Sequence, residues 1–182
     1  MSTPQRPRRA EVLRAVIAAC DARRDAVLPT DVPGVAETFS DDLDLLGALQ
    51  LRWHTRLAGR IEREQADQPE DLAGSVVRAW LAVADETPGV RVVLDMARLR
   101  PADERTRTAM TRATAKEHLL LAASAGRAAP SDLVRGARVG AALELQARSA
   151  WAGPYDAPGR RGDAGGSVPA RLWGRLRGLI PA

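Results

Sequence analysis

Residues 40–65, SDDLDLLGALQLRWHTRLAGRIEREQ, decide the fold class of this chain. Apolar residues recur every three or four positions, the spacing that gathers side chains on one face of an α-helix. The apolar face comprises Phe39, Leu43, Leu46, Trp53, Leu57 and Ile61. Ser40 is the expected N-cap, with acidic residues in the first turn behind it. Because glycine is unfavourable inside a helix, Gly47 and Gly59 predict that a neighbouring backbone approaches closely.

The same periodicity continues on both sides of this stretch, interrupted by proline and glycine. Further helices are expected over residues 9–27, 67–87, 90–99, 101–125 and 131–151. The expected N-caps are Asp67 for the second of these, which ends at residues 87–89, Thr87 for the third and Ser131 for the last. Residues 90–99 are rich in β-branched side chains, but a single strand would have no partner. The sequence therefore predicts an all-α bundle of five or six helices over residues 9–151.

Two features predict how these helices pack. Trp80 is expected in the core, because it shares an apolar face with Val76, Val77 and Leu81. Gly136 and Gly140 lie four residues apart and therefore share one face of their helix. We expect that face to cross another helix of the same domain closely.

Charge and composition exclude some classes of function. The formal net charge of +4 is concentrated in residues 1–9 and 152–182, and the sequence between them is slightly acidic. A nucleic-acid-binding domain usually carries its basic residues on the folded face, and aromatic residues for base stacking are few. No dedicated nucleic-acid site is predicted. The single cysteine, Cys20, excludes an internal disulfide framework and favours the cytoplasm.

The sequence contains no recognisable catalytic, metal or cofactor motif. His54 and His118 have no acidic residue or second histidine three or four positions away, as a helical metal site would require. Cys20 lies in an apolar helix without a histidine nearby in sequence. No catalytic residue, metal or cofactor is predicted, and we expect the protein not to be an enzyme. A site assembled across helices stays open.

A stripe of arginines on the longest predicted helix is the one candidate binding site inside the bundle. Arg52, Arg56 and Arg60 fall within one arc of the helix, beside His54. Arg52 and Arg56 have no acidic residue three or four positions away. They are candidates for binding an anion or an anionic small molecule. The alternative is a solvated face with carboxylate partners from other helices.

The two ends of the chain are expected to lie outside the bundle. Residues 1–8 are predicted to be disordered and basic, and residues 152–166 to form a flexible linker rich in glycine and proline. Residues 167–182 predict a short amphipathic helix that needs a surface to fold on, because Gly174 and Gly178 weaken it. Its expected binding residues are Leu172, Trp173, Arg175, Leu176, Arg177, Leu179 and Ile180.

These observations predict a noncatalytic, cytoplasmic interaction module of an adaptor, regulatory or cargo-like kind. Its C-terminal amphipathic peptide would dock into a groove on a protein partner. Three alternatives stay open: the peptide folds back on its own domain, it lies on an anionic membrane surface as in a peripheral membrane protein, or the arginine face serves an anion-binding or enzymatic bundle. Homo-oligomers are compatible with each alternative.

Overall fold

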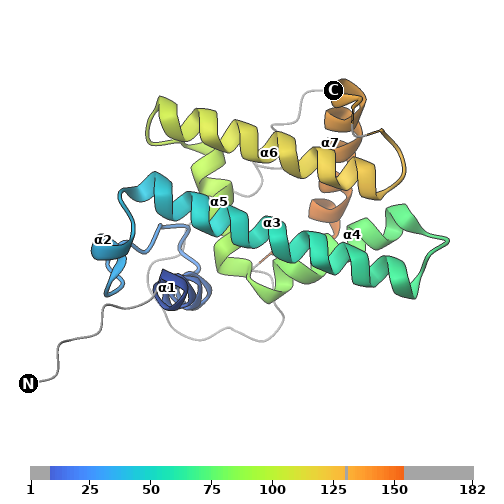
Figure 1. Ribbon diagram of the computed structural model, residues 1–182. Helices are drawn as coiled ribbons and strands as arrows, with labels where there is room; N and C mark the ends of the chain where they lie inside the picture. The colour runs from blue at the N-terminus through green and yellow to red at the C-terminus, as the bar shows by residue number, and fades with distance from the viewer. Residues whose placement is uncertain (1–8, 130, 154–182) are drawn as a thin grey trace, which may run out of the picture.

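The computed structural model describes residues 9–129 and 131–153 (Figure 1). Within these ranges all regular structure is helical, which confirms the predicted fold class. The helices are α1 (Arg9–Arg23), α2 (Val35–Thr38), α3 (Asp42–Asp67), α4 (Leu72–Glu86), α5 (Pro88–Leu99), α6 (Glu104–Ser124) and α7 (Leu133–Ala150). The described part has one helix more than predicted, because α2 forms a single turn ahead of α3. The predicted basic N-terminus, nearly all of the predicted linker and the C-terminal peptide lie outside the described residues.

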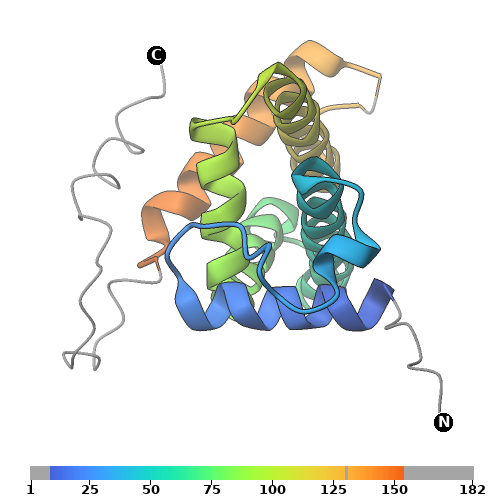
Figure 2. The same ribbon diagram turned by 90° about the vertical axis from the view of Figure 1, so that its left-hand side faces the viewer.

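The helices are arranged around α5, which is buried along most of its length. Every residue from Pro88 to Asp95 is buried. Helices α3 and α6 run side by side in the same direction (Figure 1), and α7 packs against α6 and α4. Figure 2 shows α1 lying across one end of α5. The enclosed part of α5 includes Arg91 and Asp95, so these two charged residues lie inside the protein, and this determines the site described below.

Three tryptophans form the centre of the core. Trp53 and Trp80 meet edge to face with ring centroids 5.7 Å apart, and Trp80 meets Trp151 in the same way at 5.8 Å. Trp80 is completely buried, as predicted. On α3 the apolar face differs slightly from the prediction, because Leu45 and Leu49 are fully buried and Leu43 is only half-buried.

Aspartates, rather than the residues predicted from sequence, begin four of the helices. The capping residues are Asp41 for α3, Asp71 for α4, Asp103 for α6 and Asp132 for α7. Each carboxylate accepts a hydrogen bond from the backbone amide three residues later. The predicted caps Ser40, Asp67 and Ser131 are wrong. A carboxylate next to each of the two serines also has a favourable interaction with the helix dipole, which a hydroxyl lacks.

The first helix ends earlier than predicted. It stops at Arg23, and the backbone then enters the left-handed region at Arg24 (φ 52°) and Ala26 (φ 65°). Val27, the last residue of the helix predicted over residues 9–27, is 59% exposed. The buried stripe consists of Val12, Val16 and Cys20.

Helix α5 obtains its N-terminal cap from another helix. Thr87 stands at the predicted cap position, but its hydroxyl donates to the carbonyl of Val83 at 3.0 Å. The amide of Gly89 donates instead to Oδ1 of Asp21, on α1, at 2.8 Å. A Cβ at position 89 would overlap the carbonyl of Cys20. Glycine therefore lets the backbones of α1 and α5 meet.

The glycines of α7 behave as predicted and those of α3 do not. A Cβ on Gly140 would overlap the backbone carbonyl of His118, and one on Gly136 would collide with Leu119. The close crossing of α6 and α7 is thus confirmed. By contrast, among the described residues nothing outside its own helix backbone lies within 4 Å of the Cβ position of Gly47, and the one contact found for Gly59 is with the side chain of Arg63 on the same helix. The prediction of a close approach at these two positions is wrong.

Candidate functional site

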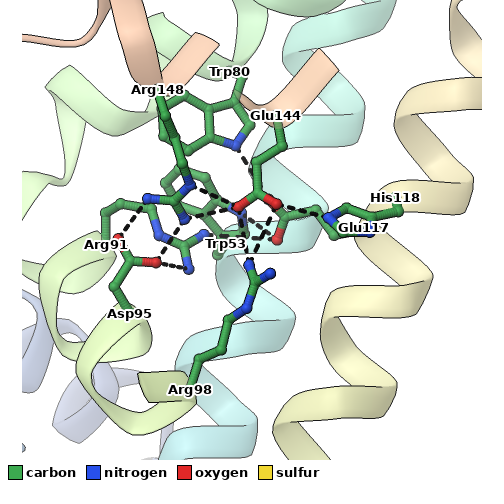
Figure 3. Close-up of polar contacts among 9 residues, drawn as sticks. All are labelled: Trp53, Trp80, Arg91, Asp95, Arg98, Glu117, His118, Glu144 and Arg148. Carbon is green, nitrogen blue, oxygen red and sulfur yellow. Dashed lines mark hydrogen bonds and ion pairs between the residues drawn. The ribbon is translucent and has the colours of Figure 1, made fainter. Parts of the chain in front are cut away.

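The most distinctive chemistry in the described residues is a set of charged side chains inside the bundle. We call it the ionic network (Figure 3), and it consists of Arg91, Asp95 and Arg98 on α5, Glu117 and His118 on α6, and Glu144 and Arg148 on α7. Arg98 is exposed and joins the network from the surface. Arg91 and Asp95 are one turn apart, 3% and 4% exposed, with Nη2 of Arg91 2.8 Å from Oδ1 of Asp95. Buried charges are tolerated only when they are paired and hydrogen-bonded.

Glu117 holds one end of the ionic network. Its carboxylate accepts the indole N–H of Trp53 and that of Trp80, each at 3.1 Å. Nη1 of Arg91 lies 3.6 Å from the same carboxylate, and the guanidinium stands 4.5 Å from the ring centroid of Trp53. Nε and Nη1 of Arg91 are buried without a hydrogen-bond acceptor. The aromatic face and the two nearby carboxylates compensate its charge electrostatically.

Glu144 holds the other end. Nε2 of His118 lies 2.7 Å from its carboxylate, Nε of Arg148 donates to it at 2.8 Å, and Nη1 of Arg98 at 3.2 Å. Burial alone would raise the pKa of Glu144. The hydrogen bond with His118 and the charges of the arginines outweigh burial and hold that pKa well below its usual range. Glu144 is therefore ionised at neutral pH.

A bidentate ion pair between Arg148 and Asp95 joins the Glu144 end of the network to the Glu117 end. Arg148 donates to Asp95 from both terminal nitrogens, at 2.6 and 2.8 Å. Burial acts to raise the pKa of Asp95, but Arg148 and Arg91 lower it overall. Arg148 has a raised pKa, because the attraction of Asp95 and Glu144 exceeds the effect of burial. The planar guanidinium matches a carboxylate in this geometry.

The arrangement fixes five helices relative to one another. The carboxylates of Asp95, Glu117 and Glu144 face the guanidiniums of Arg91, Arg98 and Arg148, and the two indoles connect α3 and α4 to the same network. Removing one member leaves an uncompensated buried charge, which is strongly destabilising. No group of three potential metal ligands occurs among the described residues.

The sequence contained a partial signal for the ionic network. Arg91 with Asp95, and Glu144 with Arg148, are opposite charges spaced one helical turn apart. On an exposed helix such pairs are ordinary. Arg91 and Asp95 interrupt an otherwise apolar run, VRVVLDM. Opposite charges one turn apart inside an apolar run indicate that the charges are buried. The partners on α6 lie too far away in sequence to be paired by spacing alone.

The arginine stripe predicted from sequence meets one carboxylate of α4 and one of its own helix. Nη2 of Arg56 is 3.0 Å from Glu86, while Arg60 pairs with Glu64 at 2.9 Å and with Glu86 at 3.5 Å. Arg52 is exposed and has no ion pair among the described residues. His54, on the same helix, is half-buried. Two of the three candidate arginines therefore have partners, and anion binding by this face stays a prediction.

The remaining candidates are placed as follows. Burial, followed by the charges of Asp21 and Asp25, raises the pKa of the Cys20 thiol to about 12, so this cysteine is not an activated nucleophile. The seven predicted binding residues of the C-terminal peptide, from Leu172 to Ile180, lie outside the described residues.

Comparison with known proteins does not extend this description. Among protein-family models, curated proteins and solved structures, none matches the chain. Within the described ranges, no helix combines the length and the apolar character needed to cross a membrane.

Proposed function

We propose that this protein is a noncatalytic interaction module of the cytoplasm, in which a helical bundle is tethered to a partner protein by its C-terminal peptide. Residues 152–166 serve as the linker and residues 167–182 as the docking helix. On a helical wheel the apolar side chains from Val168 to Ile180 occupy an arc of about 140°. Arg175 and Arg177 flank this arc on either side.

The low intrinsic helicity of the peptide supports docking rather than independent folding. Gly174 and Gly178 each destabilise the helix by about 1 kcal/mol relative to alanine. A peptide this short is not stably helical in water. Burial of the apolar arc in a partner groove supplies the missing stabilisation, in the manner of other helix-in-groove complexes.

The end of α7 also supports the proposal. Trp151, the first residue after α7, is 6% exposed and packs edge to face against Trp80. Its indole donates to Asp85 at 3.0 Å. The last helix is therefore fastened to the core immediately before the predicted linker. We expect the bundle to keep its stability when the residues beyond this point are removed.

The test compares the full-length protein with a deletion of residues 153–182 and with two point variants. Leu176→Asp places a charge in the middle of the apolar arc. Ala170→Asp, the matched control, places the same charge outside the arc. We expect the deletion to shift the melting temperature by less than about 2 °C. A partner protein should be captured by the full-length protein and Ala170→Asp, but not by the deletion or Leu176→Asp.

Three results would contradict the proposal. A large fall in melting temperature on deletion would mean that the peptide belongs to the bundle core. Equal capture by Leu176→Asp and Ala170→Asp would show that the apolar arc is not the docking face. Loss of binding to anionic vesicles in the deletion, with no captured protein, would assign the peptide to a membrane surface.

A further inference from the structure

A second surface suited to a partner lies between α3 and α6. These helices run side by side (Figure 1), and an open surface depression of about 400 Å³ lies along the first half of α6. Its lining residues are Leu43 of α3 and Glu104, Arg105, Thr108, Ala109 and Arg112 of α6. We call it the α3/α6 depression.

One wall of the α3/α6 depression carries two arginines, Arg105 and Arg112, and one carboxylate, Glu104, which pairs with Arg107 at 3.3 Å. Lys116 continues the row of basic residues just beyond the lining of the depression. Arg105, Arg112 and Lys116 are separated by seven and four residues, so they share one face of α6, and all three are exposed. We call them the basic ridge. Among the described residues the one ion-pair partner of Arg105 is Asp41, at 3.5 Å, and Arg105 is 73% exposed. Arg112 and Lys116 have no ion pair among the described residues. From Arg105 to Lys116 the ridge covers eleven residue steps, or about 16 Å of helix.

Two of the residues that line the depression are apolar. Leu43 and Ala109 are half-buried and border the depression. One turn beyond Leu43, just outside the lining, Gly47 has no side chain, and among the described residues nothing beyond its own helix backbone lies within 4 Å of its Cβ position. A surface of this kind accepts aliphatic side chains, while the basic ridge attracts acidic residues at their edge.

We propose that the α3/α6 depression and the basic ridge dock an acidic amphipathic helix of a partner protein. Three turns of such a helix match the length of the ridge. The C-terminal peptide of this chain is basic and would be repelled. No aromatic side chain lines the depression for base stacking, which favours a protein over a nucleic acid. The proposal does not depend on docking by the C-terminal peptide, and together the two surfaces would let one molecule bridge two partners.

The test measures binding of a defined probe to the full-length protein by fluorescence anisotropy. The probe is a labelled amphipathic helical peptide of leucine and glutamate, and a peptide with glutamine in place of glutamate is its uncharged counterpart. R112E/K116E reverses two charges of the basic ridge. R135E/R138E makes the same change at two exposed arginines of α7 and is the matched control. Every protein keeps both basic ends, so their contribution to binding is the same.

We expect R112E/K116E to weaken binding of the acidic peptide by about tenfold or more, and R135E/R138E by less than about twofold. Thr108→Trp fills the depression without changing the charge and should weaken binding similarly. The uncharged peptide should bind poorly to all variants. The substituted side chains are exposed, so melting temperatures should stay within about 2 °C of the parent. If R112E/K116E does not fold, R112Q/K116Q repeats the comparison.

Two outcomes would overturn the proposal. Equal losses in R112E/K116E and R135E/R138E would show that only general charge attraction is measured. The second outcome comes from a single-stranded oligonucleotide tested in parallel. If it lost affinity in R112E/K116E while the acidic peptide did not, the basic ridge would belong to a nucleic-acid surface.

Discussion

Glu117 offers the sharpest test of the ionic network, because Glu117→Gln removes a charge with almost no change in shape. The carboxylate accepts two indole N–H groups, from Trp53 and Trp80, and lies 3.6 Å from Nη1 of Arg91. A glutamine side chain has one acceptor oxygen, so its amide group would face the second indole donor to donor. Arg91 would also lose one of its two neighbouring carboxylates.

The expected loss of stability follows from these contacts. Breaking a buried ion pair by removing one partner destabilises a protein by about 3–5 kcal/mol, and an unsatisfied buried donor alone is worth about 1–3 kcal/mol. The two effects overlap at one site, so we expect the free energy of unfolding to fall by about 3–5 kcal/mol in all. Because domains are stable by only about 5–15 kcal/mol, this is a large fraction of the total.

The assay is urea unfolding followed by far-ultraviolet circular dichroism. Tryptophan fluorescence is unsuitable, because the substitution changes the surroundings of two indoles. Glu62→Gln is the matched control, since Glu62 is exposed on α3 and has no ion pair among the described residues. It should change the unfolding free energy by less than about 0.5 kcal/mol. A loss below about 1 kcal/mol for Glu117→Gln would refute the claim that the bundle depends on this charge.

Two further predictions concern acid stability and helix packing. The folded state lowers the pKa of Asp95 and Glu144 below the unfolded values of about 3.9 and 4.3, so the stability they contribute is present above the unfolded pKa values and is lost as the pH falls through the folded pKa values. Urea unfolding at pH 7, 4 and 3 should show a progressive loss of unfolding free energy that Asp95→Asn reduces, and a parent protein equally stable at pH 3 would contradict this. Gly140→Ala should destabilise the protein by about 1–3 kcal/mol, because the added methyl group meets the backbone of His118, whereas Gly47→Ala should stabilise it by up to about 1 kcal/mol. Thermal melts that rank the two variants in the opposite order would disprove the packing described for these glycines.

Periodicity was sufficient to predict the helical class and the approximate extent of the six longer helices, because an apolar stripe must face a core whatever the remaining topology. Helix ends were predicted less well. At the start of both α3 and α7 a serine is followed directly by an aspartate, and the aspartate is the N-cap in each case. The end of α1 was missed because two non-glycine residues, Arg24 and Ala26, adopt positive φ values that no sequence pattern announces.

The ionic network could not be predicted because its members come from three helices and its indole donors from two more. Spacing within one helix identifies Arg91 with Asp95 and Glu144 with Arg148, but not the pairing of Asp95 with Arg148, 53 residues apart. The glycines show the same limit. Gly140 and Gly47 look alike in sequence, yet only Gly140 faces a neighbouring helix.

The cap that Asp21 provides for α5 has a consequence for the order in which the chain folds. Asp21 and Gly89 are 68 residues apart, so the first turn of α5 cannot complete its hydrogen bonds from local sequence. Loop closure over that distance must come first, which slows folding relative to a bundle built from neighbouring helices. A chain started after α1 would lack the Asp21 carboxylate and would leave the first turn of its most deeply buried helix, α5, without this hydrogen bond.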